Sequence, residues 1–81
     1  MEIRIYGPGC YRCTELEKRT INVLARLNLA ADVEKVSDLN RMTEAGIMAT
    51  PALTINGELK CSGRVASEAE IAAWLKEAAQ G

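Results

Sequence analysis

Apolar and polar side chains alternate at the start of the chain. Between Met1 and Tyr6, Ile3 and Ile5 alternate with charged residues. A period of two places successive side chains on opposite faces of an extended backbone, so this run predicts a half-buried strand. The segment Gly7-Pro8-Gly9 then interrupts the pattern and leaves the backbone free to make a sharp turn.

A helical spacing replaces the alternation between Tyr11 and Asn28. Its charged residues fall mostly away from one face, on which apolar residues recur every three or four positions together with Thr20. The apolar members of that face are Leu16, Val23, Leu24 and Leu27. The spacing predicts an amphipathic helix of about four to five turns, and Asn28 is a plausible stop.

The middle of the chain predicts a strand and then a short helix. The strand is expected over 31–36, although its acidic residues and lysine are poor strand formers. Ser37 is a good helix N-cap and Gly46 a good helix stop. Between them, the helical positions are Leu39, Met42 and Ala45.

The last third predicts a β-hairpin followed by a helix. Strands are expected over 52–55 and 58–62, because Asn56-Gly57 is the strongest short signal for a hairpin turn. Ser67 and Glu70 form a capping box that opens the final helix. The inward stripe of this helix consists of Ile71, Trp74, Leu75 and Ala78.

The element order is therefore βαβ followed by αββα. Two parallel strands joined by a helix, together with an antiparallel hairpin, predict a four-stranded mixed sheet. We expect an α/β fold with three helices covering both faces of the sheet. The 81 residues suffice for one domain spanning 1–81, with its chemistry at the end of the first strand.

Composition and charge exclude several classes of protein. The hydrophobic fraction is 48%, the charged fraction is 26% and the net charge is −1, as in ordinary soluble domains. This charge gives no reason to expect nucleic acid or an anionic membrane as a partner. No apolar run approaches the roughly 20 residues of a membrane span, and the start of the chain does not resemble a signal peptide. We therefore expect a cytoplasmic protein.

Two cysteines two residues apart carry the candidate chemistry. Cys10 and Cys13 stand where the first strand gives way to the long helix. A cysteine at a helix N-terminus faces unpaired N–H groups and the positive end of the helix dipole, both of which favour the nucleophilic thiolate. Arg12 adds a nearby positive charge. The pattern predicts a redox-active dithiol.

Two other interpretations of the cysteines remain open. Cys10 and Cys13 could be buried structural residues, or they could bind a metal ion. Structural zinc usually needs four Cys or His ligands, but the chain has three cysteines and no histidine. A thiol-based metal carrier or sensor would use Cys10 and Cys13, with or without Cys61, or would share the ion across a dimer. Cys61 is most simply a buried strand residue, with a third redox thiol as the alternative.

The order of these features resembles the thioredoxin-fold superfamily. A strand, a Cys10-Tyr11-Arg12-Cys13 motif opening a helix, and Thr50-Pro51 before a hairpin occur together in that superfamily. The chain is most similar to small archaeal and bacterial thioredoxin-like or glutaredoxin-like proteins with a redox-active disulfide. The further segments that carry this resemblance are Gly7-Pro8-Gly9, Glu44-Ala45-Gly46-Ile47, Asn56-Gly57-Glu58-Leu59-Lys60 and Gly63-Arg64-Val65.

The resemblance implies a role for each of four residues. Cys10 would be the exposed attacking cysteine and Cys13 the buried resolving one. Pro51 would be a cis-proline that faces the disulfide, and Thr50 would offer its backbone to an extended substrate segment. The activity implied is protein disulfide oxidoreductase, with no cofactor beyond the Cys10–Cys13 disulfide itself.

The resemblance also implies partners for this site. Substrates would be proteins with disulfides, and a separate reductase or small dithiol would donate electrons. Tyr11 and Arg12, between the cysteines, are candidate substrate-binding residues, although an exposed Tyr11 without a large role is an equal alternative.

Three departures from the family pattern bear on substrate choice. Gly9 stands where thioredoxins have tryptophan, and no acidic residue stands out as a buried proton acceptor. The stretch over 62–65 lacks the paired glycines and acidic residue with which glutaredoxins bind glutathione. Arg64 within it could hold a substrate carboxylate or could simply be solvated.

Overall fold

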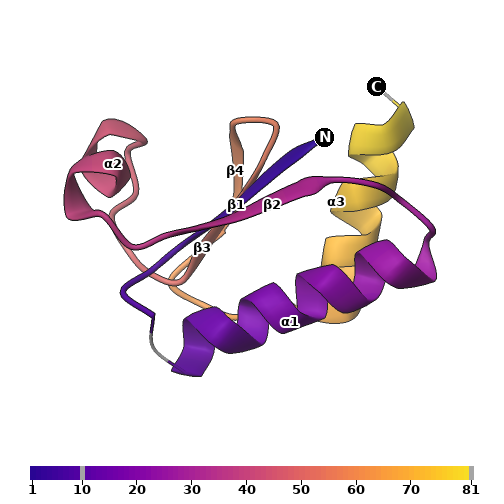
Figure 1. Ribbon diagram of the computed structural model, residues 1–81, viewed down its shortest axis with the longest axis horizontal. Coiled ribbons are helices and arrows are strands. Elements are labelled where there is room, and N and C mark those ends of the chain that lie inside the picture. The colour runs from indigo at the N-terminus through magenta and orange to yellow at the C-terminus, as the bar shows by residue number, and fades with distance from the viewer. Residues whose placement is uncertain (10, 81) are drawn as a thin grey trace.

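Over residues 1–9 and 11–80, which the computed structural model describes, the chain forms four strands and three helices (Figure 1). In chain order they are β1 (Glu2–Tyr6), α1 (Tyr11–Arg26), β2 (Asp32–Val36), α2 (Leu39–Glu44), β3 (Ala52–Ile55), β4 (Glu58–Ser62) and α3 (Glu68–Gln80). The predicted α/β class and element order are confirmed. None of the helices in this described part of the chain is both long and apolar enough to cross a membrane.

The sheet is mixed, with the strand order β2-β1-β3-β4. β1 runs parallel to β2, with Ile3 opposite Val33. It runs antiparallel to β3, with Ile5 opposite Leu53. β3 and β4 form the antiparallel hairpin. These directions bring the ends of β1, β2 and β4 and the start of β3 to one end of the sheet.

One face of α1 is buried, as its spacing predicts. Its buried residues are Cys13, Leu16, Thr20, Val23 and Leu24. The Thr20 hydroxyl donates a hydrogen bond to the Leu16 carbonyl oxygen at 2.8 Å, so burial leaves this polar group satisfied. The helix ends at Arg26, slightly before the predicted stop at Asn28, which has a left-handed φ of 56°.

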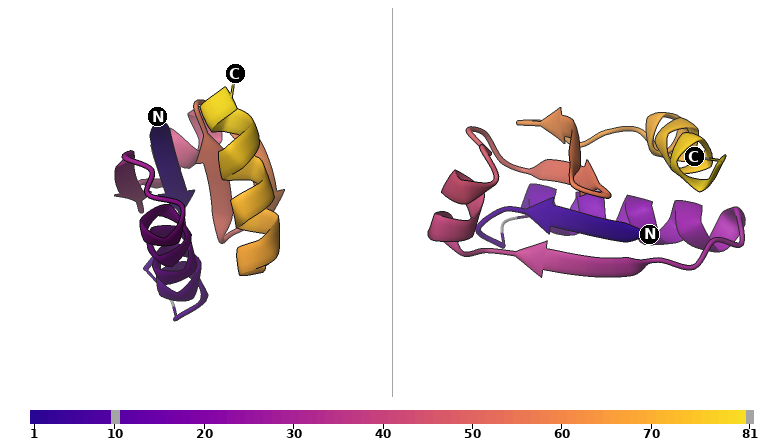
Figure 2. Two further views of the ribbon diagram at one scale, coloured as in Figure 1. Left: turned by 90° about the vertical axis from the view of Figure 1, so that its right-hand side faces the viewer. Right: turned by 90° about the horizontal axis from the view of Figure 1, so that it is seen from above.

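The main core lies between one face of the sheet and the two long helices, α1 and α3 (Figure 2). An ion pair from Arg26 to Glu68 at 3.1 Å joins the two helices, and Arg19 donates to the Ala66 carbonyl oxygen at 3.0 Å. Trp74 is half-buried against this core, as predicted. The buried members of the main core are Ile3, Ile5, Leu16, Val23, Leu24, Leu53, Ile55, Cys61, Ala66, Ile71 and Leu75.

The opposite face of the sheet is covered at one end only, by α2 (Figure 1). The prediction that helices cover both faces therefore holds only in part. Beneath α2 a second cluster buries Tyr6, Val36, Met42 and Ala52. A six-residue helix spans about 9 Å, which is too short to cover the length of the strands.

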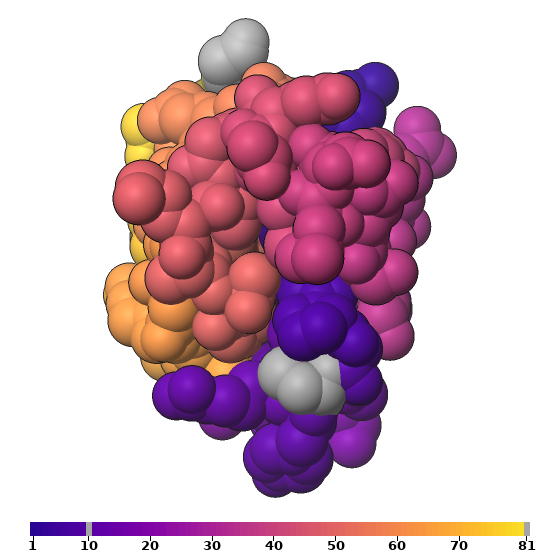
Figure 3. All heavy atoms as spheres, turned by 90° about the vertical axis from the view of Figure 1, so that its left-hand side faces the viewer, coloured from indigo at the N-terminus to yellow at the C-terminus, as the bar shows by residue number. Residues whose placement is uncertain are grey.

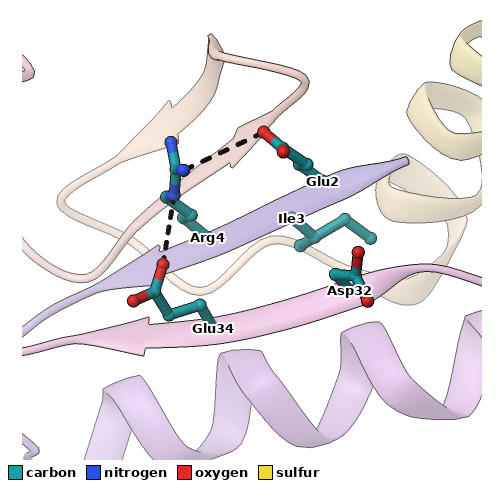
Figure 4. Close-up of a pocket in the computed structure, with 5 residues that line it drawn as sticks. All are labelled: Glu2, Ile3, Arg4, Asp32 and Glu34. Carbon is teal, nitrogen blue, oxygen red and sulfur yellow. Dashed lines mark hydrogen bonds and ion pairs between the residues drawn. The ribbon is translucent and has the colours of Figure 1, made fainter.

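Charged side chains occupy the uncovered part of this face. Arg4 lies between Glu2 and Glu34, where these residues help to line a shallow pocket (Figure 4). Glu34 accepts hydrogen bonds from Arg4 at 3.2 Å and from Arg41 at 2.9 and 3.1 Å. Arg41 first, and then Arg4, hold the pKa of Glu34 below its ordinary value. Because the pairs are exposed to water, each contributes little to stability.

Two details near α2 correct the sequence prediction. Asp38, and not Ser37, is the N-cap, and its carboxylate accepts the N–H of Asn40 at 2.8 Å. Leu39 was placed on the apolar face, but it is 75% exposed. The helix therefore begins one residue later than an N-cap at Ser37 implies, and Ser37 lies in the connection between β2 and α2.

The hairpin turn is formed by two residues with left-handed backbone. Asn56 has a φ of 53° and Gly57 a φ of 84°, the geometry that Asn-Gly turns favour. Asn56 also holds the turn against β1, because its backbone N–H donates to the Glu2 carbonyl at 2.7 Å and its side-chain oxygen accepts the Glu2 N–H at 2.9 Å.

Candidate functional site

Three segments meet at the end of the sheet where β1 stops. They are the loop after β1, the first turn of α1 and the segment between α2 and β3 (Figure 3). In Figure 3 the loop after β1 is indigo, the start of α1 is purple, and the segment from α2 to β3 runs from magenta to salmon. Cys10, the predicted attacking residue, lies outside the described residues.

Cys13 is buried at the start of α1. It is 1% exposed, whereas Tyr11 is 81% exposed and Arg12 is also open to solvent. The first turn of this 16-residue helix contains no acidic residue, so the positive end of its dipole is not offset there. Farther along α1, Glu15 pairs with Arg19 at 3.2 Å, which partly neutralises that carboxylate.

Gly7 lies close both to Cys13 in α1 and to Thr50 in the segment before β3. A Cβ at Gly7 would overlap Sγ of Cys13, and it would lie 3.2 Å from Cβ of Cys13 and 3.9 Å from Cβ of Thr50. The Gly7 N–H donates to the Val36 carbonyl at 2.9 Å, which extends the β1–β2 pairing into the loop. Gly7 thus brings Cys13 and Thr50 to within van der Waals reach of one backbone position.

The end of β4 holds the segment that contains Pro51. The Thr50–Pro51 peptide bond is cis, and Pro51 is buried. The Gly63 N–H donates to the Pro51 carbonyl at 2.9 Å, and the Ser62 hydroxyl donates to the Ala49 carbonyl at 3.1 Å. Gly63 has a φ of +79°, and a Cβ there would lie only 3.2 Å from Cβ of Ala49. These contacts fix the carbonyls on either side of Thr50.

Sequence reasoning missed this anchoring role. The segment containing Ser62 and Gly63 was compared only with a glutathione-binding stretch, and nothing in the pattern indicates a partner 13 residues away. Gly63 itself could have indicated a tight turn here, because a glycine directly after a predicted strand often adopts a left-handed backbone.

Thr50 is half-buried at this end of the sheet. Its backbone N–H and carbonyl make no hydrogen bond to any other residue that the structure describes. Tyr6 pairs with Ala52, so Thr50 lies just beyond the last pair of the β1–β3 ladder. A backbone at the end of a ladder can pair with an added extended chain.

Cys61 belongs to the main core. It is 6% exposed, pairs with Leu53 across the hairpin, and donates its S–H weakly to the Arg64 carbonyl oxygen at 3.9 Å. Burial raises the pKa of the Cys61 thiol, against a smaller opposing effect of Arg64. A neutral, buried thiol is a poor nucleophile, so the prediction of a small buried strand residue is confirmed.

Arg64 forms an ion pair within the protein. Its guanidinium donates to both carboxylate oxygens of Glu70, at 2.9 and 2.7 Å. Arg64 first, and then the Ser67 backbone, lower the pKa of Glu70 to about 2. Glu70 also accepts the Ser67 N–H at 3.1 Å, while Ser67 accepts the Glu70 N–H at the same distance, which confirms the capping box. Arg64 therefore stabilises the start of α3 through its ion pair with Glu70.

The metal-carrier alternative gains no support from the described residues. Over 1–9 and 11–80, no three histidine, cysteine, aspartate or glutamate side chains lie close enough together to hold a metal ion. Cys61 points into the main core. At the end of β1, the structure instead brings the thiol of Cys13 close to Gly7 and Thr50.

Comparisons with known proteins agree with this arrangement. A family model described as a thioredoxin domain matches residues 1–76. The chain is 45% identical over 71 residues to a thioredoxin of Methanothermobacter thermautotrophicus, covering 88% of this chain and 92% of the relative. It is 29% identical over 79 residues to a thioredoxin of Methanocaldococcus jannaschii, covering 98% and 91%. The chain belongs to the thioredoxin family of thiol–disulfide oxidoreductases.

Proposed function

We propose that the protein reduces or forms protein disulfides through the pair Cys10 and Cys13. In the reducing direction, the Cys10 thiolate attacks one sulfur of a substrate disulfide and the other sulfur leaves as a thiolate. Cys13 then attacks the Cys10 sulfur of this mixed disulfide. The second substrate sulfur leaves, so two electrons pass to the substrate and Cys10 and Cys13 become a disulfide.

The observation that carries this proposal is the placement of Cys13. Its sulfur is buried at the start of a long helix and against Gly7, a position that also lies near Thr50 in the segment before β3. A buried thiol beside an exposed loop suits the resolving role, since it meets a sulfur already bound to Cys10 rather than free substrate. We assign attack to Cys10 because it directly precedes the first residue of α1.

We further propose that an extended segment of the substrate lies along Thr50. The backbone groups of Thr50, which pair with no other described residue, support this, because main-chain pairing accepts many sequences. Tyr11 and Arg12 stand between the two cysteines in the sequence, are exposed to solvent, and would contact the same segment. A reductase or a small dithiol would return the Cys10–Cys13 disulfide to the dithiol. The cytoplasm, where such donors keep thiols reduced, is the compartment we propose.

Substitution of single cysteines tests the assignment. Cys10→Ser should abolish reduction of a model protein disulfide, whereas Cys13→Ser should accumulate a mixed disulfide through Cys10, detected by non-reducing gel and peptide mass spectrometry. Cys61→Ala is the matched control, because a buried core thiol should leave exchange intact. Full activity of Cys10→Ser would contradict the proposal, and so would trapping of substrate on Cys61.

A redox titration in thiol buffers, quenched by alkylation, gives the direction of the reaction. A reversible two-thiol transition at Cys10 and Cys13 is expected, with Cys61 alkylated only after unfolding. Potentials on related sites run from about −270 mV for reductants to about −120 mV for a strong oxidant, so the midpoint distinguishes the two.

A further inference from the structure

Gly7 differs from the other glycines that the structure describes. Gly9, Gly46, Gly57 and Gly63 have φ angles between +75° and +85°, a conformation that side chains other than glycine rarely adopt. Gly7 does not have a left-handed φ. Its φ therefore does not require glycine, and the structure points to the space around position 7 as the reason for glycine there.

The space at Gly7 is filled by Cys13. A Cβ added to Gly7 would overlap Sγ of Cys13 and would press against its Cβ at 3.2 Å, a distance shorter than ordinary van der Waals contact. At Gly9, Gly46 and Gly57 an added Cβ would meet no atom of the described residues within 4 Å, apart from those of the two neighbours in the chain. Among these positions, Gly7 is the one at which a methyl group displaces the cysteine sulfur.

The backbone of Gly7 is held on several sides and cannot easily retreat. Its N–H donates to the Val36 carbonyl at 2.9 Å, and the preceding residue Tyr6 is paired with both Val36 and Ala52. Cβ of Thr50 would lie 3.9 Å from the same added Cβ. A methyl group at position 7 would therefore be accommodated mainly by movement of the Cys13 side chain, which can rotate about one bond.

We propose that Gly7 is a positioning residue, whose missing side chain leaves the recess that holds the sulfur of Cys13. The contact follows from the structure alone. Its consequence for redox chemistry rests on the proposed function, in which Cys13 closes the disulfide with Cys10. A side chain at Gly7 turns the Cys13 sulfur out of this recess.

The displacement affects the two redox states unequally. A disulfide restricts both sulfurs to a narrow range of distances and dihedral angles, whereas a thiol can take another rotamer. A methyl group at Gly7 therefore disfavours the disulfide more than the dithiol. It also moves the Cys13 sulfur away from its line of attack on a mixed disulfide, and small misplacements of a reacting atom slow a reaction strongly.

A double-mutant cycle on unfolding tests the contact without any redox assumption. Gly7→Ala, Cys13→Ala and the double variant are compared with the parent by urea unfolding under reducing conditions. We expect Gly7→Ala to lower the folding equilibrium constant at least tenfold more in the parent than in the Cys13→Ala background, which lacks the sulfur. If Gly7→Ala alone does not fold, Cys13→Ala should restore folding. Additive effects, or failure of this rescue, would overturn the proposal.

Redox titration and trapping test the consequence. Gly7→Ala should lower the equilibrium constant for closing the Cys10–Cys13 disulfide at least tenfold, a midpoint shift of about 30 mV toward less negative values. The mixed disulfide with a model substrate should persist at least tenfold longer. Gly57→Ala is the matched control, since it adds the same methyl group at a turn at the other end of the sheet from Cys13 and should change neither quantity.

The possible failures are distinguishable. A parent protein without a reversible Cys10–Cys13 couple would overturn the proposed function, and with it the redox role of Gly7. A normal couple in the parent with the same midpoint and trapping lifetime in Gly7→Ala would overturn the positioning role alone. An equal midpoint shift in Gly57→Ala would also overturn it, because general destabilisation would then explain the effect.

Discussion

On the face of the sheet that α1 and α3 cover, eleven buried residues form one cluster, whereas the cluster beneath α2 on the opposite face has four, counted over the described residues. The first face combines long helices with a continuous apolar interior, and the second combines a six-residue helix with exposed ion pairs. The stabilisation of a fold grows with the apolar area that it buries, whereas ion pairs exposed to solvent contribute little. The helix-covered face should therefore supply most of the folding free energy.

The functional site lies beside the thinner cluster. Tyr6 directly precedes Gly7, and Ala52 directly follows Pro51, so two of the four members of the small cluster adjoin the site in sequence. Regions with few buried apolar contacts open locally at lower cost than the whole molecule unfolds. The comparison suggests a rigid layer behind Cys13 and a more easily opened layer around Thr50, where a substrate segment has to enter.

Truncation of one core residue on each face is the strongest test of this comparison. Ile71→Ala in the main core should lower the free energy of unfolding by about 3–4 kcal/mol, because the rigid surroundings cannot close the cavity. Met42→Ala beneath α2 should cost only about 2 kcal/mol, because a small cluster at the edge can relax. Urea unfolding measures both. Equal losses would show that the two faces contribute alike.

Much of the helix-covered face could be predicted from the sequence. The spacing of Leu16, Val23 and Leu24 allows only one buried face on a helix, and the alternation of Ile3 and Ile5 selects one face of a strand. These signals are local and periodic, so they do not depend on the rest of the fold. The Asn56-Gly57 turn was predictable for the same reason, because two left-handed residues in sequence favour one kind of turn.

The other face and the details of the site depend on contacts between distant segments. Ser37 and Asp38 are both good caps, and nothing in the local pattern shows that the helix uses Asp38. Gly7 looks like a turn residue until Cys13 is placed beside it. Ser62 offers no local sign that its hydroxyl holds the Ala49 carbonyl. Such roles come from tertiary packing, which a single sequence does not encode in its periodicity.

Removal of the helix caps gives a smaller and more local test. Ser67→Ala, which breaks the capping box of α3, should lower the free energy of unfolding by about 1 kcal/mol, because α3 unfolds with the main core. Asp38→Ala should change global unfolding less and should instead speed amide exchange in α2, measured by hydrogen–deuterium exchange. Global destabilisation by Asp38→Ala as large as that by Ser67→Ala would mean that α2 is part of the main folding unit.

Acid titration of the ion pairs should give the smallest effects. The folded-state pKa values of Glu70, lowered to about 2, and of Glu34 are both depressed, chiefly by arginine hydrogen bonds. A depressed carboxyl pKa contributes stability above the unfolded value, near 4.5, and this stability is lost as pH falls toward the folded value. Urea unfolding between pH 7 and pH 2 should therefore show a decline that Glu70→Gln and Glu34→Gln each reduce.

The two variants should also differ from each other. Glu70 joins Arg64 to the capping box of α3, so protonation there weakens the helix-covered face, whereas Glu34 joins only exposed side chains on the other face. We expect Glu70→Gln to remove more of the acid-dependent loss than Glu34→Gln. A larger effect of Glu34→Gln would place the acid-sensitive structure under α2, and it would reverse the order of the two faces.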